Sequence, residues 1–176
     1  MAGQAPVVSG QAAPGPAPWL SPEAIVTANR ILKSHALAFG TPLIAPLPAD
    51  ATPEQWAQAL FASERVVLAH DGSDPAGDPG PRLIYANRAA LRLWRRPWGE
   101  LVGMPSRLTA EPAVRQERSR ALLQAQSQQA IANYSGIRID SQGRRFRIDG
   151  AKVFSLRNDA GEPCGQAACF ARWYWI

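Results

Sequence analysis

The 176-residue sequence predicts an α+β domain: a five-stranded antiparallel sheet, short helices on one face of that sheet, and N-terminal helices before it. Three observations support this class. Two helix-start signals lie early in the chain, two strands and short helices follow, and three strands close it. The loops between the closing strands are too short for crossovers, so these strands must be antiparallel. Hydrophobic residues make up 46% of the chain, enough for a sizeable core.

The first 62 residues divide into a tail and a helical segment. Residues 1–20 are rich in Pro, Gly, Ala and Gln and carry no charge, which predicts a flexible tail. Residues 21–62 contain two helix starts, because Ser21 and Thr52 each precede a proline, in the order of N-cap and first helical residue. Gly40 is placed to end the first of these helices.

Residues 63–176 are predicted to form the sheet and the short helices. Apolar runs at 66–69 and 83–85 indicate two strands, separated by a loop rich in Asp, Gly and Pro over 70–81. Asn87 follows the second strand and is placed to cap a short helix.

The second half of this region is predicted to hold one longer helix and the closing strands. Residues 112–130 have a helix-forming composition. Strands are expected over 135–140, 145–156 and 165–175. The alternation within the second of these strands breaks at Gly150, which predicts a bulge that changes which residues face which side.

Composition and charge exclude several classes of protein. No stretch of 18 or more apolar residues is present, so no transmembrane helix is expected, and the N-terminus has no secretory signal pattern. We therefore expect a cytoplasmic protein that does not act at a membrane. The net charge of +5 divides into −4 over 1–81, +6 over 82–120 and +3 over 121–176. An arginine-rich middle can bind phosphate, but no nucleic-acid motif accompanies it, so nucleic acid is a disfavoured partner.

Several sequence blocks resemble a known family. The segment IYANRAAL (84–91), followed by ELVG (100–103), resembles the PAS pattern of a strand ending in Asn, an Ala-rich helix and a turn. More specific blocks follow in order: MPSRLTAEP (104–112), RQER (115–118), YSGIRI (134–139), GRRF (143–146) and GQAA (165–168). These blocks are similar to the MEKHLA domain family over roughly residues 25–174. Its members resemble PAS domains and occur as small bacterial proteins, the type this chain resembles, and at the C-terminus of plant transcription factors.

The resemblance implies a PAS-like fold over residues 63–176 and the functions that PAS-like domains share. Such domains bind a small ligand or cofactor between sheet and helices, or mediate dimer contacts. The resemblance specifies neither a ligand nor a reaction, so the cofactor is unknown at this point. Two segments depart from the family pattern: the loop 71–81 is longer, and FSL (154–156) replaces the family's WNL.

Eight residues are candidates for ligand binding, four of them in and after the MPSRLTAEP block. Thr109 and Glu111 are suited to a polar ligand, and Arg107 to a carboxylate or phosphate; Arg118 follows in the next helix. The structural alternative is that Thr109 caps that helix, Glu111 supports its first turn, and Arg107 binds Glu111 or a backbone carbonyl.

The other four candidates are Trp94, Tyr134, Arg138 and Gln166. Tyr134 and Arg138 share one face of a strand, so a ligand could contact both; the alternative is a solvated or helix-covered outer face. Gln166 could contact a flavin-like ring, or it could satisfy backbone groups. Trp94 could form the wall of a planar-ligand site, or it could belong to the core.

Other chemistry has weaker support. His70 could be an axial haem ligand or pair with Cys169 as a catalytic dyad. No cysteine lies in the helical segment where light-sensing relatives carry theirs, so a photoactive flavin is not expected. No metal-binding spacing is present.

We therefore expect a non-catalytic PAS-like sensory or ligand-binding module that signals through a homodimer or a protein partner. One alternative is a ligand-free interaction or dimerisation domain. Another is a small lyase- or isomerase-like enzyme that uses Glu111 and Tyr134 as acid–base groups.

Overall fold

The computed structural model describes residues 15–176, so most of the tail predicted over 1–20 lies outside the described residues. The helices in this part of the chain are α1 (Pro22–Phe39), α2 (Pro53–Ala62), α3 (Arg88–Trp94), α4 (Trp98–Leu101) and α5 (Arg115–Gln128). The strands are β1 (Val66–His70), β2 (Leu83–Ala86), β3 (Ala130–Ile139), β4 (Arg145–Arg157), β5 (Pro163–Phe170) and β6 (Arg172–Trp175). Within residues 15–176, no helix combines the length and apolarity that crossing a membrane requires.

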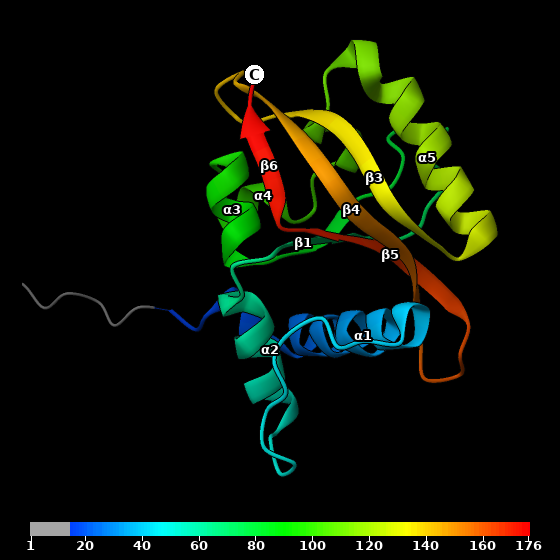
Figure 1. Ribbon diagram of the computed structural model, residues 1–176. Helices are drawn as coiled ribbons and strands as arrows, with labels where there is room; N and C mark the ends of the chain where they lie inside the picture. The colour runs from blue at the N-terminus through cyan, green and yellow to red at the C-terminus, as the bar shows by residue number, and fades with distance from the viewer. Residues whose placement is uncertain (1–14) are drawn as a thin grey trace, which may run out of the picture.

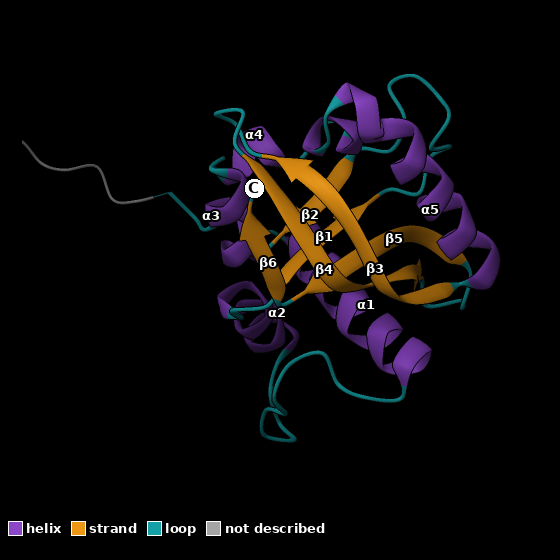
Figure 2. Cartoon of the chain, turned by 45° about the horizontal axis from the view of Figure 1, so that its top comes forward, coloured by secondary structure: helices purple, strands orange, loops and turns teal. Residues whose placement is uncertain are grey.

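The sheet is the central layer, with helices on both of its faces (Figures 1 and 2). Its strand order is β2-β1-β5-β4-β3, and every pair of neighbours is antiparallel. The predicted meander of closing strands is therefore confirmed. α1 and α2 cover one face, and α3, α4 and α5 lie on the other.

The sheet has six strands instead of the predicted five, because the last predicted strand (165–175) bends at Ala171. β1 pairs with β5 only as far as the contact between Val66 and Phe170. Beyond that point the chain has no partner on the β1 side. It continues along β4 alone, with Asp149 opposite Arg172, and forms β6.

Both N-terminal helices begin where the sequence predicts. The Ser21 hydroxyl caps α1 by accepting a hydrogen bond from Ala24 N–H, and Gly40 ends the helix in the left-handed conformation. Trp19, at the C-terminal end of the predicted tail, stacks its indole on the Phe61 ring of α2 with centroids 3.9 Å apart.

α5 starts later than predicted, and β3 starts earlier. Residues 112–114 form a 3₁₀ turn, and Gln129 takes a left-handed conformation that ends the helix. The Gln129 carbonyl accepts a hydrogen bond from Ser155 N–H of β4, and Ala130 pairs directly with Phe154. Pairing with a distant strand therefore overrides the helix propensity of this segment.

The predicted bulge at Gly150 is confirmed. Gly150 has a φ of +66°, and the register between β3 and β4 shifts by one residue at Tyr134, opposite Ala151. Before the bulge, Phe146 and Ile148 face α3 and α4. Beyond it, Phe154 and Leu156 pack under α1 instead, although in a regular strand they would share the face of Phe146 and Ile148.

Two cores result, one on each face of the sheet. The core under α1 and α2 is built from Ile31, Leu60, Val67, Tyr85, Phe154, Leu156 and Cys169, among others. The core on the opposite face includes Leu68, Leu93, Trp94, Leu101, Phe146, Ile148 and Phe170. Burying apolar surface on both faces stabilises the sheet by roughly 25 cal/mol per Å².

Asn87 joins α2, β1 and α3 through one fully buried amide. Its side-chain oxygen accepts hydrogen bonds from Ala90 N–H, which is the predicted helix cap, and from Val67 N–H at 3.0 Å. Its amide nitrogen donates to the carbonyl oxygens of Ser63 at 3.1 Å and Arg65 at 2.7 Å.

Replacing Asn87 with alanine is expected to lower the free energy of unfolding by about 3 kcal/mol or more, because the cap is lost and buried backbone groups stay unpaired. Urea unfolding followed by circular dichroism measures the change. Asn158→Ala is the matched control: Asn158 accepts from Ala160 N–H in an exposed turn, and its loss should cost about 1 kcal/mol or less. Equal losses in the two variants would contradict the assigned role of Asn87.

Candidate functional site

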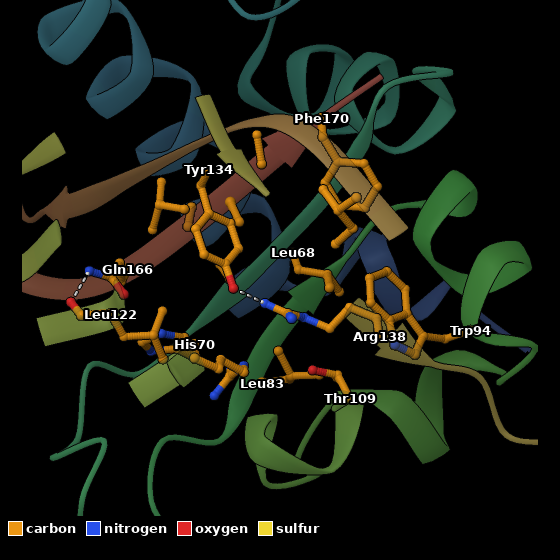
Figure 3. A pocket seen from close by; sticks show the side chains of 17 residues that line it. Leu68, His70, Leu83, Trp94, Thr109, Leu122, Tyr134, Arg138, Gln166 and Phe170 are labelled. Atoms are coloured by element: carbon orange, nitrogen blue, oxygen red, sulfur yellow. Dashed lines mark hydrogen bonds between the residues drawn. The ribbon is translucent and has the colours of Figure 1, made fainter. Parts of the chain in front are cut away.

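A cavity of about 60 Å³ lies on the α5 side of the sheet (Figure 3). Strands β1, β3, β4 and β5 form its floor, and α5 and the turn 106–109 contribute to its walls. Most of the lining is apolar. Of the eight residues proposed from the sequence, the structure brings six together around this cavity: Trp94, Thr109, Arg118, Tyr134, Arg138 and Gln166.

Tyr134 and Arg138 form the polar centre of the cavity (Figure 3). Arg138 Nη2 donates a hydrogen bond to the Tyr134 hydroxyl at 3.0 Å, and Arg138 Nη1 donates to the Ile137 carbonyl at 2.7 Å. On this face of β3 Arg138 is buried and Tyr134 is half-buried, and Ile137 and Ile139 on the opposite face are no more buried than Tyr134. The strand therefore turns its polar face inward.

Gly136 makes this pairing possible. It lies between Tyr134 and Arg138 on the same face of β3, and a Cβ built on it would be 2.5 Å from the Tyr134 hydroxyl oxygen and 3.0 Å from Arg138 Nη1. Any side chain at this position would therefore displace the phenol from the guanidinium. Sequence reasoning missed Gly136, although its spacing was a usable signal, since residues two apart share a strand face.

Arg118 brings a second guanidinium to the cavity from α5. Only 7% of its surface is exposed, as for Arg138. Burial, followed by repulsion from the charge of Arg138, lowers the pKa of Arg118 to about 9. Within residues 15–176 no carboxylate lies within 4.0 Å of either guanidinium.

His70 and Gln166 lie opposite each other at the β1–β5 end of the cavity (Figure 3). Gln166 Nε2 donates to the Leu122 carbonyl of α5 at 3.1 Å, as the structural alternative expected. Its Oε1 atom and the His70 Nε2 atom are buried, and their geometry falls short of a full hydrogen bond; the Gln166 side chain still opposes the lowering of the pKa of His70. His70 Nδ1 accepts a hydrogen bond from Gly72 N–H at 3.1 Å. The neutral ring therefore carries its proton on Nε2.

Trp94 and Thr109 also line the cavity. Trp94 belongs to the core, where its ring packs edge-on against Phe146 at 5.1 Å, and its indole N–H has no partner among the described residues. The Thr109 hydroxyl donates to the Ser106 carbonyl at 2.8 Å, within its own turn. It does not cap α5, which corrects the structural alternative.

Arg107 and Glu111 do not line the cavity. Arg107 is half-exposed and pairs with Asp78 at 3.0 Å. Glu111 Oε1 pairs with Arg145 Nε at 3.1 Å. Each interaction ties a loop to a neighbouring element, and surface pairs of this kind contribute about 1 kcal/mol or less.

The cavity fits neither a haem nor a flavin. Sites for such ligands occupy roughly 300–1,000 Å³, several times the volume present. Cys169 lies in the core under α1, on the other face of the sheet from His70, so the two form no dyad. Burial raises the pKa of the Cys169 thiol to about 11. Among residues 15–176, no three His, Cys, Asp or Glu side chains gather where they could hold a metal.

The burial of His70 predicts a pH-dependent stability. Desolvation, with repulsion from Arg118, lowers its pKa from 6.5 to about 4. Below pH 6.5 the unfolded chain takes up a proton that the folded ring does not, so His70 stabilises the fold above pH 6.5 and this contribution is lost towards pH 4. The stability difference between wild type and His70→Gln is expected to fall by about 3 kcal/mol from pH 7 to pH 4. Urea unfolding of both proteins across this range measures it, and a constant difference would contradict it.

The architecture is similar to that of solved PAS and light-oxygen-voltage domains. A PAS domain from Colwellia psychrerythraea is 13% identical, with a TM-score of 0.57 over 70% of this chain and 95% of that one. An RNA-binding light-oxygen-voltage receptor is 19% identical, with a TM-score of 0.58 over 73% of this chain and 35% of the receptor. A variant of Vivid is 13% identical, with a TM-score of 0.51 over 78% of this chain and 94% of that one. The expected PAS-like α+β fold is confirmed.

No curated protein matches the chain. The profile of the MEKHLA domain matches residues 25–175 and so includes α1 and α2 as well as the sheet. The chain belongs to the MEKHLA domain family.

Proposed function

We propose that this chain is a PAS-like sensory module that binds a small ligand in the cavity beside α5. The observation that carries the proposal is the set of buried polar groups on the cavity wall. The Trp94 indole N–H has no partner among the described residues, and His70 Nε2 and Gln166 Oε1, which face each other, do not complete a full hydrogen bond. A buried polar group left unpaired costs about 1–3 kcal/mol. A ligand or ordered water that pairs with them would recover this free energy.

Ligand binding would change the packing of α5 and β3. Arg118 and Leu122 of α5 and Tyr134 and Arg138 of β3 all line the cavity. Both elements lie at the edge of the fold (Figure 1). We propose that the signal leaves as a change in contact with a second copy or another protein from the cytoplasm.

A ligand-free interaction domain is the second candidate, and the exposed apolar residues favour it. Leu37 on α1 and Tyr174 and Ile176 at the C-terminal end are more than half exposed. Such a domain should show a mass in sedimentation that rises with concentration, and a strict monomer would exclude it. The enzyme alternative loses its acid–base pair, since Tyr134 lines the cavity and Glu111 does not.

Filling the cavity is expected to abolish ligand binding and preserve the fold. Ala151 is buried in the lining, opposite Tyr134, and Ala151→Val adds two methyl-sized groups to the cavity. The ligand-free variant should be as stable as wild type or more stable, by up to about 1 kcal/mol, because apolar groups replace empty space. A set of small carboxylates, amides and alcohols should raise the melting temperature of wild type but not of the variant.

The matched control is Ala132→Val, the same substitution at an exposed position of β3. It should respond to the compounds as wild type does. A thermal shift that persists unchanged in Ala151→Val would place binding elsewhere and contradict the proposal.

A further inference from the structure

Among residues 15–176, two arginines and no acidic residue line the cavity. Arg118 lines it from α5 and Arg138 from β3, and each is 7% exposed. The carboxylates nearest in sequence lie elsewhere: Glu117, next to Arg118, is exposed and does not line the cavity, and Asp140 pairs with Arg95. Two guanidinium groups therefore share a site from which most water is excluded.

This arrangement is costly in the empty protein. A buried charge without a counter-charge loses its hydration, which hydrogen bonds to neutral groups replace only in part, and two like charges also repel. The lowered pKa of Arg118 has these two causes. An anion between the two guanidinium groups would remove both costs.

The other polar groups of the cavity are also mainly donors. The Tyr134 oxygen accepts a hydrogen bond from Arg138, so its own proton is free to be donated. The Trp94 indole N–H has no acceptor among the described residues, and His70 Nε2–H has only the imperfectly placed Gln166 Oε1 beside it. Gln166 Oε1 is the one acceptor left unpaired on this part of the wall. A donor-rich wall of this kind suits a ligand with several acceptor oxygens.

We propose that the ligand of this cavity is a short-chain carboxylate held between Arg118 and Arg138. The inference rests on the function proposed above and specifies its ligand class. The planar guanidinium group matches the two oxygens of a carboxylate. Leu68, Ile148 and Phe170 offer an apolar surface for a short hydrocarbon chain. The volume of about 60 Å³ is far below the roughly 300–1,000 Å³ of sites for drug-sized ligands, so larger anions such as nucleotides do not fit.

The decisive experiment compares a carboxylate with its neutral isostere. Propionate and propionamide are titrated into the full chain at constant ionic strength, by calorimetry or by ligand-observed NMR. Propionate is expected to bind about tenfold tighter or more, because its hydrogen bonds to arginine are charge-assisted. In Arg118→Gln and in Arg138→Gln this preference should fall to about threefold or less. Arg107→Gln is the matched control and should keep the full preference, because Arg107 lies outside the cavity.

A second readout needs no ligand. Removing one of two buried like charges should raise the melting temperature of the empty protein in Arg118→Gln, and propionate should no longer raise it further. Equal binding of propionate and propionamide, abolished by Ala151→Val, would overturn the carboxylate inference and leave the ligand-binding function standing. No binding of either compound, or of any other small carboxylate, would overturn the inference. If, in addition, no amide or alcohol binds, the proposed function fails as well. A propionate effect that persists in both arginine variants would show a surface salt effect and overturn the inference.

Discussion

The bulge at Gly150 is the constraint on which the two-sided architecture depends. β4 pairs with β3 on one edge and with β5 and β6 on the other, and it contributes side chains to both cores. A regular strand would place Phe146, Ile148, Phe154 and Leu156 on one face, because alternate residues of a strand share a face. The inserted residue reverses this phase, so Phe154 and Leu156 pack under α1. One strand can therefore hold helices on both faces of the sheet.

The same irregularity shapes the cavity. The register shift at Tyr134 lies directly opposite, and Ala151 and Val153 follow the bulge along the cavity floor. Small side chains at 151 and 168 leave the space into which Tyr134 and Arg138 fold. The absence of a side chain at Gly136 lets those two groups meet. The cavity is thus produced by small residues at specific positions of an otherwise ordinary antiparallel sheet.

The polar lining carries a cost in stability that the fold alone does not require. A core of this size could be filled by apolar side chains, and replacing buried charges by apolar groups of similar volume is often neutral or stabilising. Arg118, Arg138 and the neutral His70 are instead kept in the interior. Buried polar and charged groups that lower the stability of the ligand-free protein, and that a bound ligand could pair with, are typical of functional sites. The similarity to PAS and light-oxygen-voltage domains, at 13–19% identity, concerns the arrangement of strands and helices. The chemistry of the cavity comes from this chain's own side chains.

Local sequence signals determined most of the elements, because their physical basis lies within a few residues. The caps at Ser21, Thr52 and Asn87 and the bulge at Gly150 all depend on short-range stereochemistry. The end of α5 and the bend at Ala171 were not predictable in this way, since pairing with β4 and the end of β1 decide them.

The candidate site, too, was determined partly by local sequence and partly by tertiary packing. The sequence by itself identified Arg118, Tyr134, Arg138 and Gln166 as candidates, but left open whether the Tyr134–Arg138 face was covered or solvated. Only the tertiary structure decided that α5 covers it, that His70 joins it, and that Arg107 and Glu111 pair with other residues. The reason is that strand periodicity shows which residues share a face, whereas the packing of distant segments determines which face is buried.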